Sequence, residues 1–366
     1  MIGNFIQLDF AVAAQMIMLG FIGGILSGFI GSGGAFFMTP GMMNLGVPGV
    51  VAVGSNISHK FGKALMGSKK HGEMGNVDKK MALFMLITAA VGIRLAVWIS
   101  TVLFAAGDKS GHGDKSAAAN LYISVVFVSV LTLVALSMLR DIVRSVRSAE
   151  AGPSRRITEA LNRLKLFPMI SFPTADVKVS LWVVLVVGLA TGYLAGTIGV
   201  GGFIGVPAMI YVFGMPTAVA AGTELYLAVF MGAFGALNYA FEGMVDLRLT
   251  LLLYLGSLIG VYIGAYGTKV VKEVIIRGVT TAIILLCVLS RAIAIPIYLR
   301  QLDLLTLDPA WDPYLNEASK VLLFVSGISG ALVILFYVAR AYIQRMRVHA
   351  TLAFVSDRTG AVKHPA

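Results

Sequence analysis

Residues 28–34 read GFIGSGG, and 168 positions later residues 196–202 read GTIGVGG. The two glycine clusters belong to a longer internal repeat, because residues 20–96 align with residues 188–264 without a gap. In that alignment 19 of the 77 positions are identical, and most of these are Gly, Pro or Asp. Shared leucines could arise from composition alone, whereas glycines in one register are hard to obtain that way, so the sequence indicates a duplication. The other matched motifs are G-x-P at 46–48 and 214–216, A-x-G at 52–54 and 220–222, and G-x-V-D at 75–78 and 243–246.

The composition is that of a membrane protein. Of 366 residues, 58% are hydrophobic and only 13% are charged, whereas soluble domains carry roughly 25% charged residues. The apolar residues recur along the chain in blocks of about 20, the length that crosses ~30 Å of hydrocarbon. The net charge of +11 does not indicate a nucleic-acid partner, because the basic residues collect at the ends of apolar blocks, as in cytoplasmic loops. We therefore predict an all-α integral membrane protein in a lipid bilayer.

Loop charges predict that the two repeats are inverted. Loop 69–80 carries four lysines and is expected in the cytoplasm, whereas its equivalent around 242–248 is acidic and is expected outside. Inversion needs an odd number of crossings per repeat. The segments 35–45 and 203–213 are too short to span, at about 16 Å of helix each. We therefore expect one glycine-broken re-entrant hairpin per repeat, followed by three transmembrane helices in the first and four in the second.

The expected organisation has four parts. These are a first transmembrane repeat (1–139), a basic cytoplasmic linker (140–178), a second transmembrane repeat (179–339) and a basic cytoplasmic tail (340–366). The N-terminus is expected outside the cell (inner) membrane and the C-terminus in the cytoplasm. A short amphipathic helix on the membrane surface is expected in the linker, from the spacing of Ile157, Leu161, Leu164 and Phe167.

The glycine clusters suggest a binding site for an anion. A helix broken in hydrocarbon leaves backbone N–H and C=O groups without partners unless the break lines a cavity or packs in protein. Helix N-termini beginning near Ala35 and Phe203 would direct free N–H groups and the positive dipole end at a shared site. The alternative is that the glycines only allow close helix packing, which explains isolated residues such as Gly256, Gly260 and Gly264 well.

A charged face follows the first cluster. Asn56, His59, Lys60 and Lys63 have the spacing i, i+3, i+4, i+7 and share one face of a helix. A lysine near mid-membrane costs about 2.5–3.5 kcal/mol, so it should face a polar cavity or a partner. Glu224, the repeat equivalent of Asn56, is the predicted partner of Lys60. For Lys63 the alternative of snorkelling to the interface is equally favoured.

Two further arginines, Arg94 and Arg291, lie within apolar runs. Each could line an anion path or make a structural hydrogen bond to the backbone, and the sequence leaves both interpretations open.

The combined motifs resemble the TauE/SafE family of sulfite and organosulfonate exporters. The resemblance covers roughly residues 20–100 and 188–267, with G-x-x-G-x-G-G, G-x-P, A-x-G-[ST] and G-x-V-D present twice. It implies an inner-membrane carrier of small sulfur oxyanions, with a site between two hairpin tips that includes the cluster glycines, Ser55 and Thr223. The chain departs from the family pattern at Asn56 and Glu224, where small residues are usual, and at the added Lys60 and Lys63.

The predicted function is export of a small anion, most closely sulfite or an organosulfonate, by alternating access driven by the membrane potential or by protons. The alternatives are an uptake carrier for a carboxylate or phosphonate and a non-transporting membrane subunit. No enzyme, cofactor or metal site is predicted, since the single cysteine is alone and no nucleophile–base pair appears. A homodimer is left open. The predicted substrate-binding residues are Gly31, Gly33, Gly34, Ser55, Asn56, His59, Lys60, Gly199, Gly201, Gly202, Thr223 and Glu224.

Overall fold

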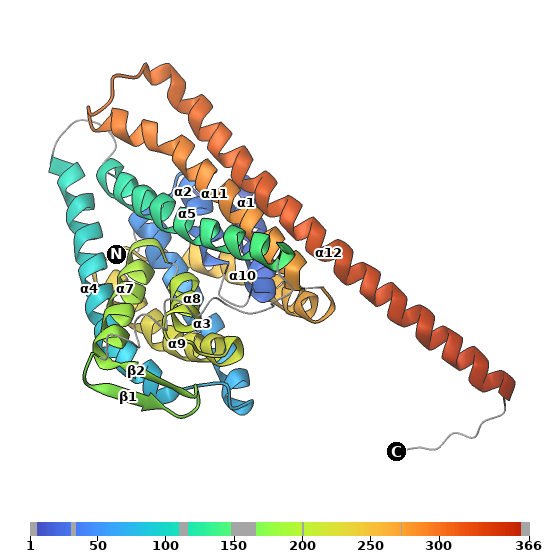
Figure 1. Cartoon of the computed structure of the whole chain (residues 1–366). Coiled ribbons are helices and arrows are strands. Elements are labelled where there is room, and N and C mark those ends of the chain that lie inside the picture. The colour runs from blue at the N-terminus through green and yellow to red at the C-terminus, as the bar shows by residue number, and fades with distance from the viewer. Residues whose placement is uncertain are drawn as a thin grey trace.

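The computed structural model describes residues 6–30, 34–109, 116–147, 166–199, 201–271 and 273–359. This part of the chain is a helix bundle with one small antiparallel sheet (Figure 1). The first repeat forms α1 (Phe10–Ile30), α2 (Ala35–Asn44), α3 (Gly49–Glu73), α4 (Lys79–Lys109) and α5 (Ala117–Arg147). Strands β1 (Met169–Phe172) and β2 (Val177–Ser180) follow. The second repeat forms α7 (Leu181–Ile198), α8 (Gly202–Tyr211), α9 (Thr217–Phe241), α10 (Leu247–Val270), α11 (Glu273–Gln301), the 3-10 helix η1 (Pro309–Trp311) and α12 (Asp312–Thr359).

The surface of the bundle suits a bilayer. Among the described residues, eight helices are long and apolar enough to cross a membrane by length and composition, namely α1, α4, α5, α7, α9, α10, α11 and α12. Large apolar side chains cover their outer faces, and on α4 Leu83, Ile87 and Val91 are each more than half exposed. Hydrocarbon solvates such a surface, whereas water would favour its aggregation. The predicted all-α membrane architecture is confirmed; the crossing by α3, which carries the charged face, stays a prediction.

The helices end where the glycine clusters predict. α1 ends at Ile30 and α2 begins at Ala35, and α7 ends at Ile198 while α8 begins at Gly202. α2 and α8 have 10 residues each, about 15 Å of helix and too short to span ~30 Å. Gly199 caps α7 with φ +77°, a left-handed conformation that favours glycine. The re-entrant course of the two pairs stays a prediction.

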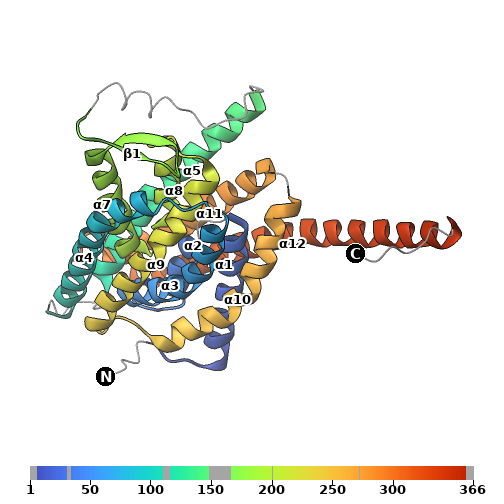
Figure 2. The same cartoon turned by 90° about the horizontal axis from the view of Figure 1, so that it is seen from below.

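The main helix pairs each join one helix from each repeat. α1 packs along α10, α7 along α4, α3 along α9 and α5 along α11 (Figures 1 and 2). Because α1 is equivalent to α7 and α10 to α4, the first two pairs are the same contact made twice.

Glycines bring these pairs into backbone contact. A Cβ on Gly24 of α1 would lie 2.6 Å from the carbonyl oxygen of Ser257, and one on Gly192 of α7 would overlap the backbone of Ala89. Gly24 and Gly192 are repeat equivalents. The interpretation that glycines allow close helix packing is therefore confirmed for one subset. This subset comprises Gly256, Gly260 and Gly264, together with the first glycine of each cluster, Gly28 and Gly196.

The starts of α3 and α9 are fixed by two equivalent contacts, which we call the cross-repeat contacts. The hydroxyl of Ser55 accepts a hydrogen bond from the backbone N–H of Asp246 at 3.1 Å. The hydroxyl of Thr223 accepts one from the N–H of Asp78 at 2.9 Å. Each A-x-G-[ST] motif thus binds the G-x-V-D turn of the other repeat. The preceding glycines are in close contact with the same turns, Gly54 with the Met244 carbonyl and Gly222 with the Asn76 carbonyl.

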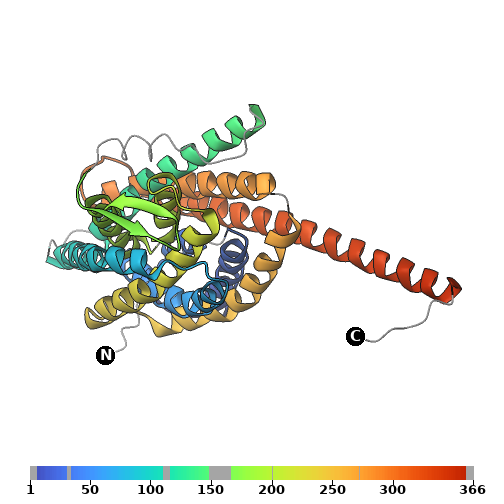
Figure 3. The same ribbon diagram turned by 60° about the horizontal axis from the view of Figure 1, so that its bottom comes forward.

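A β-hairpin occupies part of the predicted linker. Figure 3 shows β1 and β2 in front of one end of the bundle. Phe172 is fully buried there, and Lys80 Nζ donates to the Ser171 carbonyl at 2.9 Å. The turn between the two strands contains Pro173 and Asp176, and the backbone of Asp176 has φ +51°. Of the residues predicted to form an amphipathic helix, Ile157, Leu161 and Leu164 lie outside the described residues, and Phe167 is exposed before β1.

The last helix is much longer than a bilayer crossing needs. α12 has 48 residues, about 72 Å of helix, and projects beyond the bundle (Figures 1 and 2). The helix therefore continues through the predicted boundary at residue 339.

The glycine contacts generate a first prediction. Gly192→Ala should destabilise the protein because the added methyl meets the Ala89 backbone. Gly278→Ala is the matched control, since nothing lies within 4 Å of a Cβ there and alanine favours helix by up to about 1 kcal/mol. Thermal unfolding in detergent should show a lower Tm for the first variant only. Equal Tm values would contradict backbone contact between α4 and α7.

Candidate functional site

The polar face of α3 lies against the end of α7. Asn56 Nδ2 donates to Thr39 Oγ1 at 2.8 Å, and that hydroxyl donates to the carbonyl of Ile198, the last residue of α7, at 3.1 Å. A Cβ on Gly199 would lie 3.0 Å from Asn56 Nδ2. The helix break of the second repeat is therefore packed against α2 and α3 of the first, and two of the predicted site residues, Asn56 and Gly199, lie close together.

One turn further along α3, Lys60 faces Glu224 of α9. The distance from Lys60 Nζ to Glu224 Oε1 is 3.8 Å, and the two side chains are 10% and 3% exposed. Within the described residues, neither carboxylate oxygen of Glu224 has a hydrogen-bond partner. Removing two charges from water costs several kcal/mol per ion, which a pair without hydrogen bonds repays poorly. The pair thus keeps unused donor and acceptor capacity in a buried position.

Small groups leave room for the Glu224 carboxylate. Gly205 of α8 lies against it, because a Cβ at this position would collide with Oε2. The same Cβ would lie 3.2 Å from Thr191 Cγ2 of α7. Glu224 is therefore enclosed by α3, α7 and α8, next to the break between the latter two helices.

His59 and Lys63 face other helices. His59 Nε2 lies 2.7 Å from Ser257 Oγ of α10, and its ring centroid is 4.7 Å from that of Tyr254. Lys63 Nζ donates to Ser27 Oγ of α1 at 2.5 Å. The face of α3 thus meets α2, α7, α9, α10 and α1 within two helical turns.

The other predicted site residues have packing or hydrogen-bonding roles in the structure. Ser55 and Thr223 form the cross-repeat contacts. Gly34 is in close contact with the Gly23 carbonyl, and Gly201 with Ala195. Gly202 begins α8. Gly31 and Gly33 lie outside the described residues.

The charge balance around the pair favours an anion. This face of α3 carries two lysines, Lys60 and Lys63, and among the described residues only Lys60 has a carboxylate, that of Glu224, within ion-pair distance. Short helices α2 and α8 also begin beside the two breaks, and helix N-termini carry a positive dipole end. A small negative ion next to Lys60 would compensate the excess charge.

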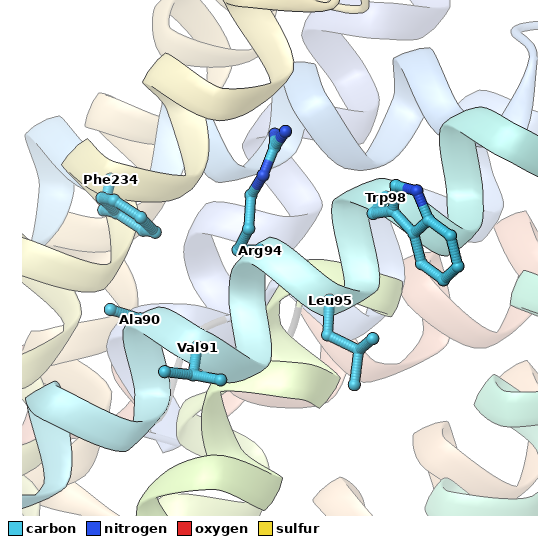
Figure 4. A pocket seen from close by; sticks show the side chains of 6 residues that line it. All are labelled: Ala90, Val91, Arg94, Leu95, Trp98 and Phe234. Atoms are coloured by element: carbon cyan, nitrogen blue, oxygen red, sulfur yellow. The ribbon is translucent and has the colours of Figure 1, made fainter.

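A shallow groove on the outer face of α4 is a different feature. It has a volume of about 480 Å³ and is lined by Ala90, Val91, Arg94, Leu95, Trp98 and Phe234 (Figure 4). The guanidinium of Arg94 donates to Asn238 at 3.2 Å and to Glu242 at 3.4 Å. Because Trp98 and Val91 are more than half exposed, this groove lies on the outer surface of the bundle, and none of the predicted site residues lines it.

Sequence reasoning missed several partners of the charged face. Thr39 gave no signal because its repeat equivalent is Pro207. Tyr254 and Ser257, spaced three apart in the apolar α10, could have been found as a polar pair on one helix face.

The buried pair generates a second prediction. Lys60→Met leaves the Glu224 carboxylate buried without its cation, which should lower the free energy of unfolding by about 3–5 kcal/mol. The double variant Lys60→Met with Glu224→Gln should recover most of that loss. Thermal unfolding of the purified variants checks this. A double variant no more stable than the single one would show that the two groups are not coupled.

Comparisons with known proteins identify the family of the chain. The family described as "Sulfite exporter TauE/SafE" matches residues 16–291. Three proteins of Bacillus subtilis (strain 168) are similar: "Probable membrane transporter protein YjnA" (30% identity, 70% of this chain and 90% of that protein), YdhB (25%, 72% and 93%) and YunE (25%, 68% and 86%), both with the same description. No solved structure matches. The matched region includes both glycine clusters and extends from within α1 through all of α10, so the chain belongs to the TauE/SafE family of membrane proteins.

Proposed function

We propose that the chain is a secondary transporter that moves small anions, most closely sulfite or organosulfonates, out of the cell by alternating access. The observation that carries the proposal is the buried Lys60–Glu224 pair beside the α7–α8 break. Membership of a family of membrane transporters supports transport in general. The family description supports the sulfur oxyanion as substrate class.

The binding step follows from the charges. An oxyanion entering beside Lys60 accepts hydrogen bonds from its ammonium group, which carries three donors. Asn56 and the amide groups of the helix break supply neutral donors nearby. Glu224 opposes the anion and keeps the empty site from holding an uncompensated lysine. Binding and release are then an exchange of partners at Lys60, consistent with a drive from the membrane potential or protons.

Inversion of the repeats supplies the two access states. The helix pairs α1–α10 and α7–α4 repeat one contact, as a two-fold relation between repeats would require. The loop before α4 is rich in lysine and the loop before α10 is acidic, so the proposed relation places them on opposite faces of the membrane. Movement of the α1–α10 pair relative to the α7–α4 pair would open the central site to each side of the membrane in turn.

The inverted topology can be tested with cysteine labelling. In a Cys287→Ala background, Lys79→Cys and Leu247→Cys place one thiol each at exposed, equivalent helix starts. A membrane-impermeant maleimide should label position 247 in intact cells and position 79 only in inverted vesicles. Labelling of both positions from one side would overturn the inversion.

The transport role of Lys60 is tested by counterflow. Purified protein in liposomes should exchange labelled sulfite, organosulfonates or carboxylates, and Lys60→Ala should lose at least 10-fold in rate because the anion loses a charged hydrogen bond. Lys320→Ala is the control, since that lysine pairs with Glu317 on α12. Normal flux in Lys60→Ala would remove Lys60 from the site. Increased sulfite sensitivity of a deletion strain would distinguish export from uptake.

A further inference from the structure

Arg291 is a buried charge that the candidate site does not use. It lies in the middle of the apolar α11 span Ile275–Gln301 and is 1% exposed. It is among the largest fully buried side chains of the described residues. A charged residue at this depth is costly and generally faces a partner or a polar cavity.

The guanidinium of Arg291 has one hydrogen bond in the described part of the chain. Its Nη2 donates to the hydroxyl of Tyr298 at 3.0 Å, and its central carbon lies 5.6 Å from the centroid of that ring. Nε and Nη1 have no hydrogen-bond partner there. No described carboxylate lies within ion-pair distance, in contrast to Arg94, Arg248 and Arg300, which face Glu242, Asp246 and Asp312.

This arrangement favours binding of an anion. The guanidinium does not lose its proton in proteins, so it cannot become neutral on burial. Each buried donor without a partner costs about 1–3 kcal/mol, and more for a charged group. The planar fork of N–H groups matches the oxygen atoms of sulfonate, sulfite, carboxylate or phosphate. We propose that Arg291, oriented by Tyr298, forms a second binding site for a small oxyanion.

The position of Arg291 connects it to the candidate site. Its neighbour Ser290 donates to the Ser319 carbonyl at 2.6 Å and accepts from Asn44 Nδ2 at 3.4 Å. Asn44 ends α2, five residues after Thr39, or about 7.5 Å along the helix. The observation that supports the oxyanion site is the unpaired guanidinium of Arg291. Its role as a second binding site on the transport path rests on the proposed function as well.

The occupant is a free anion and not a lipid headgroup. Arg291 lies ten residues before Gln301, about 15 Å from the end of the helix. Headgroups lie at the membrane surface, and almost no surface of Arg291 is open to them.

Equilibrium binding of labelled methanesulfonate to purified, delipidated protein tests the proposal. The wild type should bind two anions and Arg291→Gln one, with affinity at the lost site weakened on the order of 10- to 100-fold. Tyr298→Phe should weaken that site less, because the guanidinium remains. Arg94→Gln is the matched control, an arginine in an apolar span whose partners are protein side chains, and it should retain both anions.

A second test uses the wild-type protein alone and locates the bound anion in crystals soaked in 2-bromoethanesulfonate. An anomalous bromine peak beside Arg291 supports the site. No peak there, unchanged binding by Arg291→Gln, or a phospholipid as the sole occupant overturns it. Binding lost in Lys60→Gln but not in Arg291→Gln leaves the proposed function standing and refutes this inference. The reverse result supports the Arg291 site and refutes the candidate site at Lys60.

Discussion

The cross-repeat contacts fix the geometry on which the rest of the structure depends. A hydroxyl at the start of α3 binds the turn before α10, and a hydroxyl at the start of α9 binds the turn before α4. Asn56 and Glu224 directly follow these hydroxyls in sequence, so the contacts also position the two polar side chains that lie beside the α7–α8 break. The resemblance assigned Ser55 and Thr223 to the binding site. In the structure both hydroxyls take part in the cross-repeat contacts, and their role in binding stays a prediction.

The scaffold is symmetric but its chemistry is not. Asn56, His59, Lys60 and Lys63 on α3 correspond to Glu224, Leu227, Ala228 and Met231 on α9. All basic groups of the candidate site therefore come from one repeat and the acid from the other. Because α3 contacts five other helices through this face, a change in its charge or position would alter its contacts with members of both helix pairs, α1–α10 and α7–α4. Under the proposed function, the buried charges would thus link binding to helix arrangement.

Sequence reasoning predicted the features that would cost free energy in hydrocarbon unless the fold compensated for them. Helix breaks followed from glycine density and from segment lengths too short to span, and the Lys60–Glu224 pair followed from the cost of a lysine in hydrocarbon. Spacing places His59 and Lys63 on one face of α3, but it does not say which helix lies opposite, so Ser257 and Ser27 were not found. The β-hairpin was missed because its strands have four residues each, too few for a clear alternation. Arg291 was recognised as unusual, but its lack of a carboxylate partner needs three-dimensional neighbours.

The pairing of helices between repeats has a consequence for biogenesis. The main packing partners of α1, α3, α4 and α5 all lie in the second repeat. When the first half of the chain leaves the ribosome, the partner helices of its glycine-lined faces have therefore not yet been synthesised. Until α7 to α11 are synthesised, those faces and the lysines of α3 must contact lipid or an insertion factor in the membrane. Assembly of this protein is therefore completed late in translation, and a truncated first half would be a substrate for quality-control proteases.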